Sequence, residues 1–173
     1  MAAHDTTTIT TSAVLAALSE HPEWQEKARE QSMAVDGDLT LETLDSLTVL
    51  DLVIKESLRL VAPVPSLARK AIKDTELVGY HIPAGTFMSV SPWFSHYMPE
   101  YWSNPTEFDP DRFAEPRSED KKHRFAWVPF GGGAHKCIGM YFGTQEVKML
   151  LHHMLRRYRW SVPAGYKVPW DLV

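Results

Sequence analysis

The sequence predicts a mainly α-helical domain with a small β-sheet, an α+β fold. Residues 47–60 and 140–155 carry apolar side chains at intervals of three and four residues, which places those side chains on one face of a helix. Between these stretches, residues 66–90 contain short alternating runs that glycine and proline interrupt, a pattern typical of strands joined by turns. Helices before and after a short strand region are the basis of this assignment.

Two helices are expected at the start of the chain. The first runs to about Ser19, although the threonine-rich run at residues 6–11 has low helix propensity and by itself would also suit a helix cap or a strand. The second begins near Pro22 and continues to about Ser32. Proline suits the first position of a helix because the N–H group that it lacks has no helical partner there.

A turn and two further helical segments follow. Residues 36–38 read Asp-Gly-Asp, which is a turn composition, and residues 40–43 begin a short helical turn. The helix of residues 47–60 ends before Pro63, because the residue that precedes a proline is disfavoured in the α conformation.

Three short runs are expected to form the sheet. They are residues 66–72, 77–82 and 86–90, and Gly79 and the turn at residues 83–85 interrupt them. Glycine and proline at these places favour turns, so the runs predict one small sheet.

The remaining chain lacks periodicity until its last helix. Residues 93–127 are rich in proline and aromatic side chains, which predicts a short helix followed by long irregular backbone. A glycine-rich loop precedes the helix of residues 140–155, and a basic cluster at the end of this helix is expected to complement its terminal carbonyl groups. The cluster consists of Arg156, Arg157 and Arg159.

Composition limits the class of protein. The chain has 173 residues, of which 44% are hydrophobic, enough to bury the core of one domain. Its single cysteine excludes an internal disulfide framework. No stretch approaches the roughly 18 apolar residues of a membrane span, and the N-terminus lacks a secretory signal. We therefore expect a cytoplasmic protein, with a lost N-terminal membrane anchor as the open alternative.

The charge of the chain is unevenly distributed. A net charge of −4 argues against a nucleic-acid partner. Residues 117–136 nevertheless have a basic excess that flanks the single cysteine, because only Glu119 and Asp120 oppose the cationic side chains there. Those side chains are Arg117, Lys121, Lys122, Arg124 and Lys136.

The single cysteine follows a run of glycines. Residues 131–133 let the backbone adopt positive φ angles and approach a flat, bulky group closely. A helix is expected to start at Cys137, whose thiolate would be stabilised by the free N–H groups and the dipole of the first turn. Such a thiolate suits an iron ligand. The alternative is a glycine-rich turn with a buried, inert cysteine.

The spacing around the cysteine matches a known pattern. Phe130, Gly133, Cys137 and Gly139 fill the pattern Phe-x-x-Gly-x-x-x-Cys-x-Gly, which resembles the haem-binding loop of the cytochrome P-450 monooxygenases. The resemblance implies that the chain binds haem b (iron protoporphyrin IX), with Cys137 as the axial ligand of the iron. It also implies that Phe130 packs beside the cysteine and that Gly133 and Gly139 allow close approach of the backbone.

A second pattern, Glu-x-x-Arg, occurs at Glu56 and Arg59. Alone it would be an ordinary exposed ion pair on one face of a helix. In the family that the chain resembles, this pair is buried and joined by an arginine from a later Pro-x-Arg-Phe segment, which here supplies Arg112. The resemblance implies a structural triad that holds the core beneath the cysteine loop.

A third pattern, at residues 2–7, resembles the acid–alcohol stretch of the helix that crosses the distal face of the haem. Ala3 departs from it, because the family commonly has glycine there. Asp5 and Thr6 would be the catalytic residues: a carboxylate that relays protons and a hydroxyl that donates a hydrogen bond to the bound dioxygen. A helix cap is the competing interpretation of both residues.

Further site residues follow from the resemblance. Arg69 and His135 stand where the family binds the haem propionates, and neutralising two carboxylates requires such donors. The alternatives are a solvated strand charge for Arg69 and a loop histidine bonded to backbone for His135. Val64, Pro65 and Leu67 are expected to line the substrate side, or else to be ordinary packing.

The order of elements resembles the C-terminal half of the cytochrome P-450 fold over essentially the whole chain. We expect residues 1–173 to be a partial domain, from the distal helix to the cysteine-loop helix and the following strand. The implied function is insertion of one oxygen atom of dioxygen into an apolar small-molecule substrate. A ferredoxin or a flavin reductase domain, docked on the basic side, would supply the electrons. The isolated chain is expected to be inactive, and the alternative function is a non-catalytic haem-binding or degenerate fragment without a complete substrate pocket.

A zinc site is a weaker alternative. Five side chains could supply ligands, but no pair has the usual Cys-x-x-Cys or spaced-histidine pattern. They are His123, His135, Cys137, His152 and His153.

Overall fold

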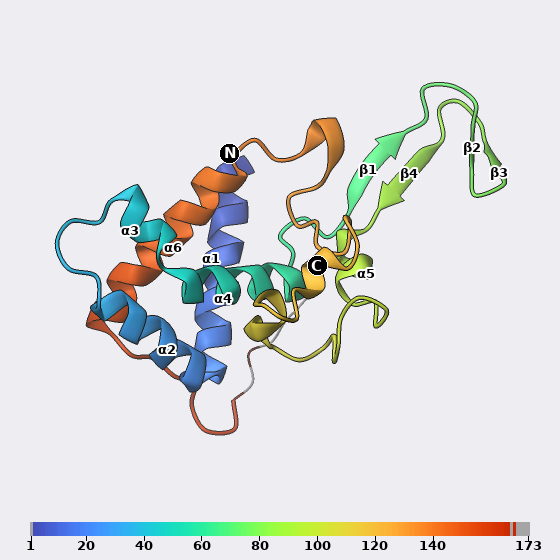
Figure 1. Cartoon of the computed structure of the whole chain (residues 1–173). Helices are drawn as coiled ribbons and strands as arrows, with labels where there is room; N and C mark the ends of the chain where they lie inside the picture. The colour runs from blue at the N-terminus through green and yellow to red at the C-terminus, as the bar shows by residue number, and fades with distance from the viewer. Residues whose placement is uncertain (1, 167, 169–173) are drawn as a thin grey trace.

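The structure is a computed structural model that describes residues 2–166 and 168 of the chain. Figure 1 shows a group of helices from which a ribbon of β-strands projects. The α-helices are α1 (Ala2–Glu20), α2 (Pro22–Met33), α3 (Leu41–Asp45), α4 (Thr48–Leu60), α5 (Pro92–His96) and α6 (Met140–Arg157). All described strands lie between α4 and α5, which confirms the mainly helical class with a small strand region. None of the described helices is long and apolar enough to cross a membrane.

Helix α4 lies at the centre of the helical group and contacts α1, α2 and α6 (Figure 1). Leu50, Val53, Ile54 and Leu58 recur at helical spacing along α4 and are buried. Each such side chain contributes about 1.5–3 kcal/mol relative to exposure, so this face decides where α4 sits. Its partners in the core are Val14 and Leu18 of α1, Trp24 and Ala28 of α2, Leu44 of α3, and Val147, Leu151 and Leu155 of α6.

The threonine-rich run lies inside α1 and forms neither a cap nor a strand. The hydroxyl of Thr10 donates to the carbonyl of Thr6, and that of Thr11 to the carbonyl of Thr7, both at 2.8 Å. Bonding back to the preceding turn satisfies these hydroxyls within a helix. The low helix propensity of the run is overcome by tertiary packing of the rest of α1 against the core.

The starts of α2 and α3 agree with their sequence signals. Helix α2 has Pro22 in its first turn. At the start of α3 the N–H of Thr43 donates to the hydroxyl of Thr40 at 3.2 Å, and the N–H of Thr40 donates to the hydroxyl of Thr43 at 2.7 Å. This reciprocal cap satisfies donors that have no partner in the first turn of a helix.

A carbonyl group in the last turn of α6 accepts a hydrogen bond from a residue that the sequence did not indicate. Arg29 of α2 donates a hydrogen bond to the carbonyl of Leu155. Of the arginines expected to serve this end, Arg156 donates to the carbonyl of Val35 at 3.0 Å, and Arg159 pairs with a glutamate of α2 at 2.8 Å. The packing of α2 along α6 decides which cation reaches the helix end.

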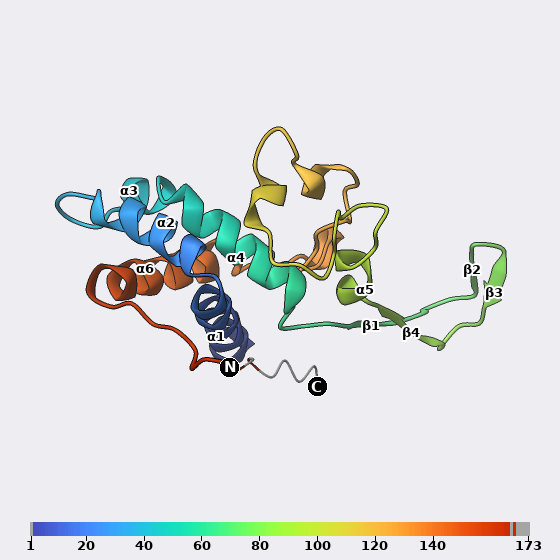
Figure 2. The ribbon, with the colours of Figure 1, turned by 90° about the horizontal axis from the view of Figure 1, so that it is seen from below.

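The strands form two ladders where the sequence predicts one sheet. Val78 and Gly79 connect β2 to β3 with φ angles of 51° and 81°, and two positive φ angles are what a two-residue type I′ turn requires. Figure 2 shows both ladders extending away from the helices. The antiparallel pairs are β1 (Leu67–Lys70) with β4 (Phe87–Val90), and β2 (Thr75–Leu77) with β3 (Tyr80–Ile82).

The chain between α5 and α6 is irregular, as the sequence predicts. Trp102, Phe113 and Ala126 form a second small buried cluster there, next to α4. Short 3-10 turns occur at η1 (Pro110–Phe113), η2 (Glu119–Lys121) and η3 (Gly133–His135).

The segment after α6 is held by α1 and α2. The side chain of Gln25 donates to the carbonyl of Trp160 at 2.8 Å and accepts from the N–H of Trp160 at 3.1 Å. The indole of Trp160 donates to the carbonyl of Leu15 at 2.9 Å. Residues 158–166 form no strand, and residues 167 and 169–173, which also belong to the stretch where a strand is expected, lie outside the described residues.

Candidate active site

A cavity of about 510 Å³ lies between α1, α4, β1, α6 and the cysteine loop, which comprises residues 129–139. Its volume falls within the roughly 300–1,000 Å³ that is typical of cofactor and small-molecule sites. The lining is mainly apolar. It includes Thr6, Thr7 and Thr10 of α1, Ile54 and Leu58 of α4, Val64, Leu67 and Arg69, then Phe130, His135, Cys137, Ile138 and Gly139 of the loop, and Phe142, Gly143 and Val147 of α6.

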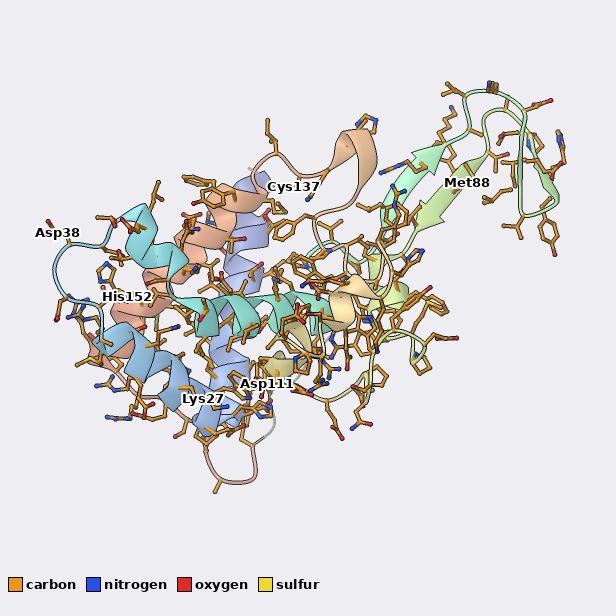
Figure 3. All side chains as sticks on the ribbon, in the orientation of Figure 1. Lys27, Asp38, Met88, Asp111, Cys137 and His152 are labelled. Carbon is orange, nitrogen blue, oxygen red and sulfur yellow. The ribbon has the colours of Figure 1, made fainter. Side chains whose placement is uncertain are left out.

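Cys137 lines this cavity from the loop that leads into α6 (Figure 3). Its N–H donates to the carbonyl of Phe130 at 2.9 Å, which ties the two ends of the loop together. Helix α6 begins at Met140 with Gly139 as its N-cap, so the prediction that Cys137 lies in the first helical turn is wrong. The cysteine still lies at the helix end where free N–H groups and the dipole favour an anion.

The glycines of the loop have two separate roles. Gly131 and Gly133 have φ angles of 71° and 69°, which residues with a Cβ rarely adopt. A Cβ at Gly133 would meet no other protein atom within 4 Å, so within the protein it is the backbone angle that favours glycine there. A Cβ at Gly139 would lie 3.9 Å from the Sγ of Cys137 and would narrow the space beside the sulfur. An exposed thiol beside glycine backbone, opening on an apolar cavity, fits a thiolate-ligated haem.

The two proposed catalytic residues have different surroundings. Thr6 lines the cavity together with Thr7 and Thr10. Asp5 is not among the described lining residues; its side chain is 75% exposed, and its carboxylate lies 2.9 Å from Nδ1 of His4. The N-terminal part of α1 therefore brings Thr6 to the wall of the cavity and leaves the carboxylate of Asp5 exposed. The side chain of Ala3 lies outside the described residues.

The expected propionate ligands both reach the cavity. Arg69 of β1 and His135 of η3 are exposed residues of its lining. A guanidinium Nη1 of Arg69 donates to the carbonyl of Ala68 at 2.9 Å, which leaves further donors available. Of the expected substrate-side residues, the described lining includes Val64 and Leu67 but not Pro65.

The predicted triad is present and buried. Arg59 donates to both carboxylate oxygens of Glu56, from Nε at 2.7 Å and from Nη2 at 2.8 Å. Arg112 of η1 donates to the same carboxylate from Nε at 3.0 Å. All three side chains are fully buried. The interpretation as an exposed ion pair is therefore wrong, because the segment around η1 covers this end of α4.

Sequence reasoning missed a fourth member, Glu119. Its carboxylate accepts from Nη1 of Arg112 at 3.1 Å, from the hydroxyl of Ser103 at 2.6 Å and from Arg117 at 3.0 Å. Burial opposes its ionisation, but the hydrogen bonds from Ser103, Arg117 and Arg112 outweigh burial and lower the pKa of Glu119 to about 2. No periodic pattern surrounds this residue, so the sequence held no signal for it.

Sequence reasoning also missed His96, at the end of α5. It is fully buried between α4 and the start of the cysteine loop. Burial lowers the pKa of His96 to about 4, so the ring is neutral near pH 7. The signal that could have found it is a histidine within an aromatic, proline-rich stretch, which is too common to be specific.

Phe130 is held by an aromatic contact. The ring of Trp127 meets it edge-on, with the ring centres 6.0 Å apart. The indole N–H of Trp127 donates to the carbonyl of Lys55 in α4 at 3.1 Å. Trp127 therefore connects Phe130, whose carbonyl bonds Cys137, to α4, the helix that carries Glu56 and Arg59 of the triad.

The basic side chains near the cysteine are partly bonded. Lys121 pairs with Glu115 at 2.8 Å, and Lys122 donates to the carbonyl of Tyr101 at 2.8 Å. Lys136, next to Cys137, is exposed. Among the described residues, no three His, Cys, Asp or Glu side chains form a group that could hold a metal ion by themselves.

Comparison with known proteins gives consistent matches. The family model for cytochrome P450 matches residues 1–171. "Putative cytochrome P450 136" of Mycobacterium tuberculosis is 50% identical over 173 residues, which are 99% of this chain and 35% of that protein. The sterol 14alpha-demethylase of Mycolicibacterium vanbaalenii is 37% identical over 96% of this chain and 38% of its own length. Rat thromboxane-A synthase is 36% identical over 99% of this chain and 33% of its own length.

The chain spans about a third of the length of the curated relatives that it matches. The family match covers nearly all of it, including the cavity, the cysteine loop and the buried triad. By sequence and by the residues that its fold brings together, the chain belongs to the cytochrome P450 family.

Proposed function

We propose that the protein to which this chain belongs is a haem-thiolate monooxygenase that inserts one oxygen atom of dioxygen into an apolar organic substrate. The observation that carries the proposal is that Cys137 and Thr6, from opposite ends of the chain, line the same cavity. The family match supports a haem cofactor, and haem b is the form proposed here. When bound, a haem with a thiolate ligand supplies the binding and activation of dioxygen.

The residues of this chain would hold the cofactor from several sides. The thiolate of Cys137 would be the axial ligand, and Gly139 keeps the space beside the sulfur open. Arg69 and His135 would bind the two propionates through charge-assisted hydrogen bonds. The edge-on contact of Phe130 with Trp127 would keep the phenyl ring beside the sulfur and so limit access of water.

Proton delivery would use the N-terminal part of α1. Asp5, whose carboxylate is exposed, would relay protons from solvent, and Thr6, which lines the cavity, would donate a hydrogen bond there from its hydroxyl. This role requires that the two side chains exchange a proton directly or through water.

An apolar substrate is supported by the lining of the cavity. Val64 and Leu67 line it near β1, and no acidic side chain belongs to the described lining. Binding of an apolar substrate is favourable here because apolar surface of both the substrate and the cavity is removed from water. The electron donor would be an acidic ferredoxin or flavin domain attracted by the basic side chains near the cysteine, Lys136 among them.

A substitution of the proposed ligand tests this function in the full-length protein. Reduced protein with carbon monoxide should show the strongly red-shifted Soret band of a thiolate-ligated haem, and Cys137→Ser should abolish both this band and the activity, because serine cannot supply thiolate donation. Gly133→Ala, which opposes the backbone angle of the loop but leaves the sulfur in place, should reduce haem content without abolishing the band. A Cys137→Ser protein with an unchanged spectrum would refute the assignment.

A second candidate function applies to the 173-residue chain by itself, namely haem binding without catalysis. Ile138 and Phe142, which line the cavity, are 105% and 70% exposed in the described structure. A cavity with walls open to solvent excludes water poorly, and oxygen activation requires exclusion of water.

A further inference from the structure

His96 joins two backbone segments that are far apart in the sequence. Its Nε2 accepts a hydrogen bond from the N–H of Val128 at 2.9 Å, and its Nδ1 lies 3.1 Å from the carbonyl oxygen of Arg59. Because Nε2 accepts, the single proton of the neutral ring is on Nδ1, which therefore donates to Arg59. The pKa of about 4 that results from burial keeps the ring in this neutral form near pH 7.

The contact with Arg59 fixes His96 to the end of α4. The carbonyl of Arg59 belongs to the last turn of this helix, where carbonyl groups lack helical partners. Arg59 also donates from Nη1 to the carbonyl of His96 at 2.8 Å, so the two residues bond each other in both directions. The same helix supplies Ile54 and Leu58 to the cavity.

The contact with Val128 leads to the cysteine. The carbonyl of Val128 accepts from the N–H of Gly131 at 3.0 Å, which forms the turn that opens the cysteine loop. Phe130, inside that turn, accepts from the N–H of Cys137 at 2.9 Å. The bond from Val128 to the ring of His96 and the two backbone bonds of the loop thus link His96 to the residue that carries the thiol.

We propose that His96 is a positioning residue: it sets the position of the cysteine loop relative to α4, and through the loop the position of Cys137. The proposal rests on the proposed role of Cys137 as haem ligand. A neutral imidazole holds one donor and one acceptor on opposite sides of a rigid ring. An asparagine amide can reach the place of Nδ1 and a glutamine amide that of Nε2, but neither reaches both.

Hydrogen–deuterium exchange on the purified protein tests the proposal without requiring haem. His96→Asn keeps the donor toward Arg59 and leaves the N–H of Val128 without its acceptor, so the amides of Val128, Gly131 and Cys137 should exchange roughly tenfold faster. His96→Gln keeps that acceptor, and the bond from Nη1 of Arg59 to the backbone carbonyl of residue 96 still joins this segment to α4, so protection should be retained at all three amides. Tyr97→Phe is the matched control, because it removes the neighbouring bond to the carbonyl of Leu60 at 2.9 Å and leaves the ring of His96 in place. It should leave the exchange of the loop unchanged.

The spectrum of the haem-loaded protein supplies a second readout. Reduced His96→Asn with carbon monoxide should show a mixture of thiolate and neutral-thiol Soret bands, whereas His96→Gln and Tyr97→Phe should keep the thiolate band. Unchanged exchange at Gly131 and Cys137 in His96→Asn, or equal acceleration in His96→Gln or Tyr97→Phe, would overturn the proposal. If His96→Asn does not fold, His96→Gln decides: protected loop amides in this variant support the proposal, and rapid exchange of them overturns it. A wild-type protein without a thiolate band would contradict the proposed function. The exchange measurement would still test whether His96 positions the loop, because it does not depend on haem.

Discussion

Glu56 shows how single residues of this chain tolerate burial of charge. Its carboxylate accepts from Arg59, from Arg112 and from the N–H of Asp109 at 3.0 Å. Both arginines direct further donors at carbonyl groups, such as that of Pro105, 2.7 Å from Nη1 of Arg59. Buried ions are tolerated only when charge and hydrogen bonds are both satisfied, and this network satisfies both.

Removing one member of the network should be costly. Arg59→Ala leaves the carboxylate of Glu56 buried with one guanidinium, so the free energy of unfolding should fall by about 3–5 kcal/mol in urea titrations. The control is Arg159→Ala, which breaks an exposed pair with Glu26 and should lower the free energy of unfolding far less, because solvent screens that pair. If Arg59→Ala lowers the free energy of unfolding as little as the control does, the buried triad stabilises the fold no more than an exposed ion pair.

Acid should destabilise the protein through His96. The unfolded state takes up a proton near the ordinary pKa of 6.5, whereas the folded state does so only near 4. Between these values the unfolded state binds more protons, so stability is present above about pH 6.5 and falls by about 3 kcal/mol as pH drops to 4. His96→Gln should flatten this part of the stability curve, measured by urea unfolding at successive pH values.

Helix α4 is the element that connects the core to the site. Its apolar face packs against α1 and α6, while its last two turns carry Glu56 and Arg59 of the triad and Leu58 of the cavity lining. Lys148 of α6 is buried and donates to Asp51 of α4 at 3.0 Å, which ties the two helices. A shift of α4 would therefore disturb the core, the triad and the cavity at once.

The junction of α2 with α6 gives a test at the scale of elements. Arg29 bonds the carbonyl of Leu155 in the last turn of α6 and reaches that of Tyr158 at 3.3 Å. Arg29→Ala should lower the free energy of unfolding by about 1–2 kcal/mol, because a cationic hydrogen bond at a helix C-terminus is lost. Arg157→Ala, at an exposed position of the same last turn, should change it by less than about 0.5 kcal/mol. Equal losses for Arg29→Ala and Arg157→Ala would show that any cation near the end of α6 stabilises it, without the specific bond from Arg29.

The cavity is a property of the whole molecule. Its walls come from α1 at one end of the chain and from the cysteine loop and α6 near the other, with α4 and β1 between them. Two apolar side chains of its lining, Ile138 and Phe142, are exposed in the described structure, so the cavity is open to solvent on their side.

The 173-residue chain by itself should therefore retain haem weakly and show no hydroxylation. Haem loading followed by gel filtration measures retention, and product analysis with an apolar substrate and a supplied electron donor measures turnover. The full-length protein is the positive control. Stoichiometric haem together with hydroxylated product from the isolated chain would contradict this expectation and would make the open cavity sufficient for catalysis.

Local patterns in the sequence determined the helices, the turns and the residues around Cys137. The spacing of Leu50, Val53, Ile54 and Leu58 predicts α4 because helical periodicity acts over a few residues. The positions of Phe130 to Gly139 likewise form one short segment. The split of the strands into two ladders was not predictable in this way, because pairing depends on how the chain bends between runs that look alike.

Only the tertiary structure decided which distant residues meet. Nothing local marks Glu119 as the partner of Arg112, Arg29 as the donor at the end of α6, or His96 as the bridge to Val128. Each of these contacts exists because packed apolar faces bring two segments together, and a buried polar group at that junction must then find a partner. The sequence thus indicated which residues are candidates for the chemistry, and long-range packing decided how they are held.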